Sequence, residues 1–166
     1  MNECDLKKII NRIEHEITIN FNEKYFYDHF LPEYSPSPIS SLNSHLFTPI
    51  LDITSRGGKR LRPVLLILIT KLFSGDEDAA YRFAPVIEAI HTASLVHDDI
   101  EDGSVKRRGE DALHIKYGID TALNAGSWLY FFALSLIEKQ NKDIRESLYT
   151  VTVQALTLLH LGQAFD

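Results

Sequence analysis

The stretch from Val64 to Phe73 is apolar on nearly every side, with Pro63 ahead of it and Ser74-Gly75 behind it. Proline suits the first turn of a helix, because the N–H that it lacks needs no partner there. A following glycine favours helix termination, and a helix without a polar face has to be buried by other elements. Because no segment of the chain shows sustained alternation of apolar and polar residues, we expect those covering elements to be helices.

Apolar residues recur at helical spacing along most of the remaining chain. The expected helices span residues 5–31, 42–56, 77–101, 112–117, 119–139 and 143–166. Segment 32–41 holds three prolines and four serines, so we expect a loop there. Asp76 is placed to cap the 77–101 helix, although Pro85 leaves a start near residue 84 as an alternative. The predicted fold class is all-α, with about seven helices in one helical domain over residues 1–166.

Charge and hydropathy exclude several classes of protein. The net charge is −6 at pH 7 and no long basic run offsets it, which argues against nucleic-acid binding. The longest apolar runs, at 64–70 and 128–137, fall short of the roughly 18 residues that a membrane span needs. The single cysteine, Cys4, excludes an internal disulfide, and the N-terminus lacks the apolar segment of a signal peptide. We therefore expect a soluble, cytoplasmic protein without a membrane span.

Three carboxylates near the end of the 77–101 helix form a candidate metal site. Asp98 and Asp102 lie four residues apart, so they share one helical face and are separated by about one turn of ~5.4 Å, and Asp99 lies beside them. Mg²⁺ prefers oxygen ligands and usually takes one or two carboxylates together with water and substrate phosphates. The alternative is a solvated acidic helix end, since a motif this short also arises by chance.

The sequence G-G-K-R-L-R-P at residues 57–63 is a candidate anion site. Its glycines let the backbone approach a ligand closely. Lys59 supplies a point charge, and Arg60 and Arg62 supply planar guanidinium groups, a combination suited to a diphosphate. A basic surface turn is the alternative.

Two arginines follow the acidic motif in a charged loop that we expect over residues 103–111, after Gly103 ends the helix. Adjacent side chains such as Arg107 and Arg108 do not easily face the same way, so they suit two anionic groups on different sides. A solvated loop is the more common use of such a pair.

Two polar positions lie on predicted helix faces. His91 precedes Asp98 by seven residues, which places it on the carboxylate face and suits either ligand contact or a structural role. Gln163 and Asp166 lie about one turn apart on the last helix, and alone they favour a structural role.

The order of these motifs from Gly57 to Asp166 resembles the trans-isoprenyl diphosphate synthases (polyprenyl synthetases), particularly the geranylgeranyl diphosphate synthase type. The matching segments are G-G-K-R-L-R-P, H-T-A-S-L-V-H-D-D-I-E-D, R-R-G and the terminal G-Q-x-x-D. The resemblance implies an isoprenoid synthase-like bundle of antiparallel helices around a central cavity, usually as a homodimer. It also implies condensation of an allylic diphosphate with isopentenyl diphosphate.

The resemblance implies roles for individual residues as well. Mg²⁺ bridging to the allylic diphosphate would be held by Asp98, Asp99 and Asp102, with Arg107 beside that diphosphate. The isopentenyl diphosphate would be bound by Lys59, Arg62, His91 and Arg108, with Arg60 counted among the substrate-binding residues. Gln163 and Asp166 would line the cavity from the opposite wall. Because Ala93 and Ser94 before the first aspartate are small, the resemblance implies a product of C20 or longer.

The sequence also departs from the family pattern. It has no second D-D-x-x-D, and Ser127-Trp128-Leu129-Tyr130 replaces the family's D-A-L-L, which predicts altered packing or dimer contact. We therefore keep three hypotheses: the N-terminal half of a prenyl synthase, a regulatory prenyl-diphosphate-binding subunit, and a class I terpene cyclase, which G-G-K-R-L-R-P disfavours. Since helices 119–139 and 143–166 are apolar over much of their circumference, we expect self-association or pairing with a complementary chain.

Overall fold

A computed structural model describes residues 3–31 and 39–165 of the chain. Its elements are α1 (Glu3–Asn20), α2 (Glu23–Phe30), α3 (Ile39–Leu42), the π-helix η1 (Asn43–Phe47), α4 (Thr48–Ser55), α5 (Leu61–Leu72), α6 (Glu77–Glu101), β1 (Lys106–Arg107), β2 (Glu110–Asp111), α7 (Leu113–Tyr117), α8 (Ile119–Ile137) and α9 (Lys142–Gln163). The predicted all-α class is confirmed.

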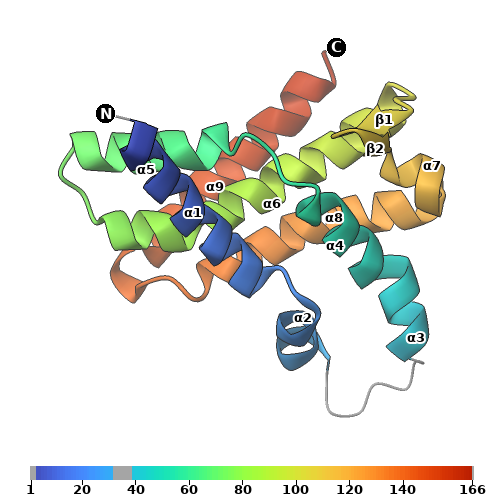
Figure 1. The fold of residues 1–166 in the computed structure, drawn as a ribbon, viewed down its shortest axis with the longest axis horizontal. Coiled ribbons are helices and arrows are strands. Elements are labelled where there is room, and N and C mark those ends of the chain that lie inside the picture. Colours follow the sequence, from blue (N-terminus) through green and yellow to red (C-terminus); the bar gives the residue numbers. More distant parts are fainter. Residues whose placement is uncertain (1–2, 32–38, 166) are drawn as a thin grey trace.

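Helices α6 and α8 form the centre of the molecule and make its most extensive helix–helix contact (Figure 1). Small side chains allow this close approach: Ala89 and Ala93 of α6 and Ala122 and Ala125 of α8 are fully buried. Helices α1 and α5 pack on other parts of α6, so the long helix is covered from several directions. A ligand can therefore reach only those side chains of α6 that α1, α5 and α8 do not cover.

Helix α6 begins and ends close to the predicted positions. The side chain of Asp76 accepts a hydrogen bond from the backbone N–H of Ala79 at 3.0 Å, which caps the first turn. Pro85 lies inside the helix and is buried, so the alternative start near residue 84 is wrong. Packing of the long helix outweighs a proline cost of about 3 kcal/mol.

Two predicted helices are broken. The helix expected over 5–31 stops at Asn20 and restarts at Glu23, because the side chain of Asn22 accepts a hydrogen bond from Tyr25 N–H at 2.9 Å and caps a new helix. The helix expected over 42–56 is divided by η1, and Pro49 lies in the first turn of α4. Of the loop expected over 32–41, residues 32–38 lie outside the described part and the remainder belongs to α3.

The charged loop at 103–111 contains a short hairpin, so the expectation of no strand is wrong there. Strands β1 and β2 are antiparallel, with Lys106 paired to Asp111 and Arg107 paired to Glu110. Arg108 and Gly109 form the turn with φ angles of 52° and 85°. Positive φ at both central positions is the pattern of a type I′ turn, which matches the twist of a two-residue hairpin.

Trp128 joins α8 to the aromatic residues of α2 and η1. Its ring stacks on Phe132 with centroids 5.0 Å apart, and its edges meet Phe26 at 5.2 Å and Phe30 at 5.3 Å. Phe47 of η1 lies 6.1 Å away. Trp128 therefore makes contacts within the chain that hold α2 against α8.

Helices α5 and α9 leave apolar side chains exposed. On α5 these side chains follow one another at helical spacing: Leu61, Leu65, Ile69 and Leu72, with Phe73 next to the end. In the described part of α9, Thr152 is the buried side chain, while Val151, Leu158 and Leu161 are exposed. Helix α8 is largely covered instead, although Phe131 is 70% exposed. Within the described ranges, no helix has both the length and the hydropathy that a membrane crossing requires.

Candidate functional site

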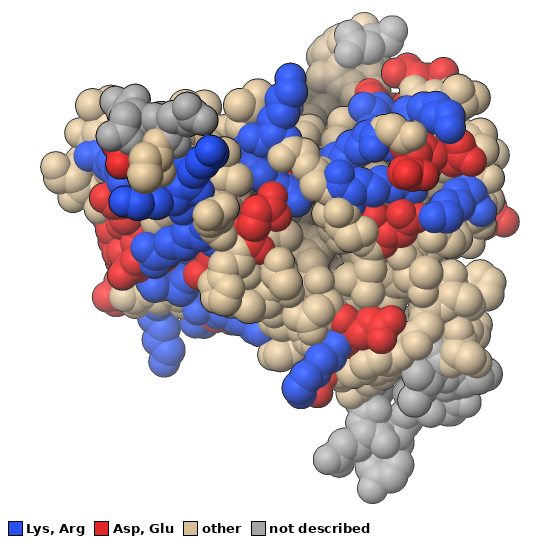
Figure 2. Space-filling model, viewed as in Figure 1, with Lys and Arg blue, Asp and Glu red and all other residues tan. Residues whose placement is uncertain are grey.

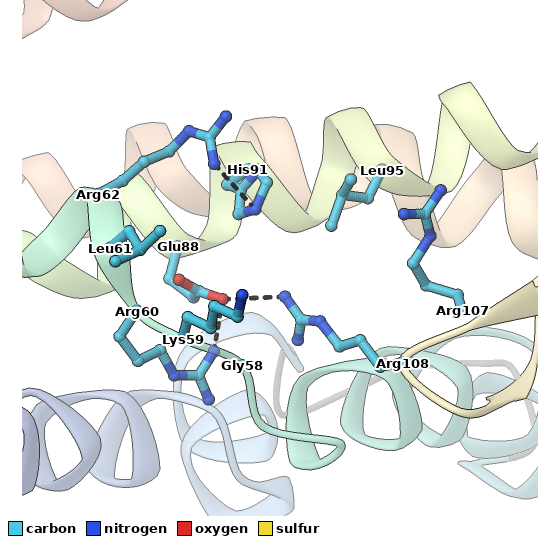
Figure 3. Close-up of a pocket in the computed structure, with 10 residues that line it drawn as sticks. All are labelled: Gly58, Lys59, Arg60, Leu61, Arg62, Glu88, His91, Leu95, Arg107 and Arg108. Carbon is cyan, nitrogen blue, oxygen red and sulfur yellow. Dashed lines mark hydrogen bonds and ion pairs between the residues drawn. The ribbon is translucent and has the colours of Figure 1, made fainter.

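A cavity of about 370 Å³ lies between the segment before α5, the middle of α6 and the β1–β2 hairpin (Figure 3). Its lining residues are Gly58, Lys59, Arg60, Leu61, Arg62, Glu88, His91, Leu95, Arg107 and Arg108. The structure thus brings together six of the residues predicted from the sequence: Lys59, Arg60, Arg62, His91, Arg107 and Arg108. On the molecular face seen in Figure 2, the coloured basic side chains are interspersed with acidic ones, so that face has no continuous basic surface.

The backbone before α5 takes conformations that favour glycine. Gly57 has a φ of 70° and Gly58 a φ of 158°. A Cβ atom on Gly58 would lie 3.5 Å from the Cζ of Arg108, so the glycine brings this segment into contact with the hairpin arginine. Lys59 and Arg62 on either side of Arg60 are exposed, which leaves both cations open to a ligand.

Arg60 lies differently from its two basic neighbours. It takes a left-handed conformation with a φ of 48°, and its side chain is only 2% exposed. Its Nε and Nη2 donate to the two oxygens of Glu14 at 2.7 and 3.2 Å, and its Nη1 donates to Glu88. Burial lowers the pKa of Arg60, but the two carboxylates more than offset this and raise it overall. Its charge is therefore balanced within the protein.

The two hairpin arginines point to different carboxylates. The Nε of Arg107 donates to both oxygens of Asp99, at 2.9 and 3.0 Å, and its Nη2 lies 3.6 Å from Asp98. Arg108 donates from Nη2 to Glu88 at 3.2 Å and from Nη1 to the carbonyl of Ile53 at 3.2 Å. This divergence is what the sequence predicts for adjacent arginines.

Arg56 holds the backbone of the hairpin. Its Nη1 donates to the carbonyls of Arg107 and Asp111 at 3.1 and 2.8 Å, and Asp52 accepts from its Nε at 3.0 Å. Burial alone would raise the pKa of Asp52, but hydrogen bonds from Arg56, Lys116 and Tyr117 hold it well below its usual range. The sequence reasoning missed this pair, although the i,i+4 spacing of Asp52 and Arg56 is a signal that could have found it.

Glu88 and Glu14 were also missed. Glu88 is 2% exposed and lies on the most buried part of α6. An isolated acid on an otherwise apolar helix face is the signal that marks it, because a buried carboxylate requires a partner. Glu14 has no comparable signal, since it lies 46 residues from Arg60 in the sequence.

The three aspartates divide into an open pair and a buried one. The side chain of Asp99 is 2% exposed and occupied by Arg107, whereas that of Asp98 is 40% exposed and Asp102 is exposed at the helix end. In residues 3–31 and 39–165, no cluster of three or more acidic, histidine or cysteine side chains is arranged to hold a metal ion. Asp98 and Asp102 fit Mg²⁺ as a two-carboxylate site that substrate phosphates and water would complete.

His91 lies between the cavity and α5. Its Nε2 is 3.2 Å from the Nη1 of Arg62, which can donate to a neutral ring. Burial, together with the nearby charge of Arg62, lowers the pKa of His91 below its ordinary 6.5. The neutral form of the His91 ring is therefore favoured at pH 7, and the positive charge of this pair belongs to Arg62.

An apolar cavity of about 550 Å³ adjoins the cationic one, between α5, α6 and α9. The two cavities share Arg62 and His91. The walls are otherwise mainly apolar: Leu66, Phe83, Ile87, Ile90, Leu148, Val151, Ala155 and Leu159. Ser94 also lines this cavity, whereas Ala93 is fully buried in the core and does not.

Gln163 ties the end of α9 to the acidic end of α6. Its Nε2 donates to Oε2 of Glu101 at 2.7 Å, and it lines a small cavity of about 60 Å³ with Ser94 and His97. Its predicted partner on the last helix, Asp166, lies outside the described residues.

Replacing Gly126 with alanine is expected to destabilise the protein by about 1–3 kcal/mol through overpacking. A Cβ there would lie 2.8 Å from Cε1 of His97 and 3.0 Å from Cγ1 of Val96. The ring of His97 has little room to move, because its two nitrogens lie 2.9 Å from the Ala93 carbonyl and 3.3 Å from the Ser127 hydroxyl. Urea denaturation measures the loss.

Gly162→Ala is the matched control for this substitution. Gly162 also lies in a helix, and a Cβ there would meet nothing within 4 Å. Removing a helical glycine is then expected to stabilise by up to about 1 kcal/mol. Stabilisation by Gly126→Ala of the same size would show that His97 and Val96 yield without cost.

Comparison with known proteins identifies the family to which the chain belongs. The polyprenyl synthetase family model matches residues 43–166. The chain is 31% identical to the geranylgeranyl diphosphate synthase of Saccharolobus solfataricus, an alignment that covers 100% of this chain and 47% of the relative. It is 36% identical to that of Sulfolobus acidocaldarius, with 74% of this chain and 36% of the relative covered.

Solved structures agree with these relatives. A crystal structure of geranylgeranyl pyrophosphate synthase superposes with a TM-score of 0.81 at 26% identity, covering 100% of this chain and 45% of that one. The synthetase from Pyrococcus horikoshii Ot3 gives a TM-score of 0.71 at 28% identity over 96% of this chain and 47% of that one. The chain thus spans less than half the length of these relatives. Both its sequence and its fold show that it belongs to the polyprenyl synthetase family.

Proposed function

We propose that this chain provides the diphosphate-recognition part of a Mg²⁺-dependent prenyltransferase, which condenses an allylic diphosphate with isopentenyl diphosphate. The observation that carries the proposal is the meeting of a cationic cavity with an apolar one at Arg62 and His91. A molecule with a diphosphate head and a hydrocarbon tail fits such a pair of cavities. The proposal includes a cytoplasmic location.

The isopentenyl diphosphate is assigned to the cationic cavity. Lys59 and Arg62 are the exposed cations of this cavity, whereas Arg60 and Arg108 are buried or nearly so and paired with Glu88. Lys59 and Arg62 would meet the ligand first, and Arg108 would add a charge from the cavity wall. Guanidinium groups give paired, directional hydrogen bonds to phosphate oxygens, and an ammonium group adds charge without fixed direction. Neutral His91 keeps Arg62 in place without adding a charge of its own.

The allylic diphosphate is assigned to the end of α6. Asp98 and Asp102 would hold Mg²⁺ there, and the ion would stabilise the negative charge of the departing diphosphate. Arg107 lies beside Asp98 and is held by Asp99, so a second positive charge is fixed next to the leaving group. When the allylic C–O bond breaks, the electron pair leaves with the diphosphate, and the double bond of isopentenyl diphosphate attacks the carbocation that remains. The second carbocation formed in this way loses a proton to the departed diphosphate, which restores a double bond.

The hydrocarbon chain is assigned to the apolar cavity of about 550 Å³. Apolar walls keep water away from the carbocation. Ser94 leaves room at the end near Asp98, while Ile90, Ile87 and Phe83 follow along α6 away from the aspartates. This arrangement supports a product of C20 or longer.

A second wall is expected from another polypeptide segment. The 166 residues contain no second aspartate-rich motif, and the chain spans less than half of its relatives. The exposed apolar side chains of α5 and α9 suit coverage by further helices. We propose a homodimer or pairing with a complementary chain. A second candidate function is that of a regulatory subunit that binds prenyl diphosphates. It is supported by the cationic cavity, because residues of this chain alone line it.

Assay of the purified 166-residue chain with isopentenyl and farnesyl diphosphates and Mg²⁺ tests the proposal. We expect both diphosphates to bind, with little or no turnover, because the second wall proposed above would not be present in the assay. Robust C20 formation would contradict the need for a second wall. If calorimetric titration detects binding of neither diphosphate to the chain, the proposed function itself is overturned.

A further inference from the structure

Glu88 is a buried acid in the middle of the cationic cavity. Among the ten residues that line the cavity it is the only acid, and its side chain is 3% exposed (Figure 3). A buried carboxylate persists only where partners compensate its lost hydration. The partners of Glu88 therefore indicate what it does.

One oxygen of Glu88 serves two arginines that come from distant segments. Its Oε1 accepts from Nη1 of Arg60 and from Nη2 of Arg108, the latter at 3.2 Å. Arg60 has a second acid, Glu14, which it meets with two hydrogen bonds. Within the described part of the chain, the other hydrogen-bond partner of Arg108 is the neutral carbonyl of Ile53. Arg108 consequently depends on Glu88 more than Arg60 does.

The charges of this cluster compensate one another. Two acids, Glu14 and Glu88, face two arginines, Arg60 and Arg108. Without Glu88, Arg108 would keep the neutral carbonyl of Ile53 as its hydrogen-bond partner, so nothing charged would fix the direction of its Nη2. Burial lowers the pKa of Arg108, and Glu88 offsets only part of that decrease. The hydrogen bond from Arg108 therefore makes Glu88 the charged group that directs this guanidinium.

We infer that Glu88 is a positioning residue that fixes Arg108 for a diphosphate in the cationic cavity, by a hydrogen bond shared with Arg60. The inference rests on the function proposed above. Glu88 itself repels an anion, so a role limited to electrostatics and a positioning role predict opposite results. Removing its charge tightens anion binding if only the electric field matters, and weakens binding if the direction of Arg108 matters.

The test compares Glu88→Gln with Glu77→Gln, using calorimetric titration of inorganic diphosphate and of isopentenyl diphosphate without Mg²⁺. Glu77 is a partly exposed acid on the same helix, about 16 Å away along its axis, so its replacement changes the net charge equally. We expect about tenfold weaker binding for Glu88→Gln and less than about twofold change for Glu77→Gln. Equal or tighter binding by Glu88→Gln would overturn the inference.

A double variant, Arg60→Met with Glu88→Gln, separates positioning from charge balance. It leaves one acid, Glu14, and one arginine, Arg108, in the cluster. We expect the midpoint of thermal unfolding to recover relative to Glu88→Gln while diphosphate binding stays weak. Recovery of binding would show that Glu88 only balances Arg60, and would overturn the inference. If the wild-type chain binds neither probe, the proposed function fails and the inference fails with it, which is distinct from failure of the variants alone.

Discussion

Mg²⁺ is expected to increase the affinity for a diphosphate, and replacing Asp98 with alanine is expected to remove most of that increase. The affinity measured with Mg²⁺ should fall by about tenfold or more. Asp98 and Asp102 are the two open carboxylates at the end of α6, because Asp99 is occupied by Arg107. A single remaining carboxylate holds the ion only weakly. Binding measured without Mg²⁺ should change little or become slightly tighter, since a negative charge near the ligand is lost.

Titration of farnesyl diphosphate with and without Mg²⁺ measures both parts of this effect. Glu146→Ala is a suitable control, because Glu146 is an exposed acid within α9 and its loss changes the net charge in the same way. An unchanged Mg²⁺-dependent gain in the Asp98→Ala variant would argue against Asp98 as a metal ligand.

Replacing Phe132 with alanine is expected to cost about 3–5 kcal/mol of the free energy of unfolding. Phe132 is 1% exposed, and its ring stacks on Trp128 and meets Phe21 and Phe26 edge-on at 5.0 and 5.4 Å. The neighbouring rings, Trp128 and Phe26, are fixed on α8 and α2, so they cannot move to fill the cavity that the Phe132 ring leaves. Helix α2 should detach first, because these rings attach it to α8.

The neighbouring Phe131 provides the control for this prediction. It lies on the same helix but is 70% exposed, so Phe131→Ala is expected to change the free energy of unfolding by less than about 0.5 kcal/mol. Chemical denaturation of both variants makes the comparison. A similar loss for the two substitutions would indicate that the exposed face of α8 is buried in an assembly.

The sequence predicted the long helices well because their signals are local. The cap at Asp76 and the recurrence of apolar residues at helical spacing are both visible in the residues themselves. The break at Asn22 went unpredicted because its side chain caps the next helix while the apolar pattern continues through it. The π-helical turn at 43–47 has no comparable sequence signal.

For the candidate site, the sequence predicted the residue types better than their directions. The prediction counted Arg60 with Lys59 and Arg62 among the substrate-binding residues, but the left-handed backbone at Arg60 turns its side chain into the interior. Similarly, Asp99 lies about 100° around the helix from Asp98, which places it toward Arg107 rather than on the open face. The acids that balance the arginines were missed because Glu14 and Arg60 meet only after the chain has folded.

The short β1–β2 hairpin sets a limit on the length of segment 103–111. Arg107 reaches Asp99 and Arg108 reaches Glu88 because one is the last residue of β1 and the other begins the turn. A one-residue change of register reverses side-chain directions in a strand. Surface loops usually tolerate insertions and deletions. Here a single residue gained or lost would turn Arg107 away from Asp99 and Arg108 away from Glu88. Among proteins built in this way, this loop is therefore expected to vary in composition more freely than in length.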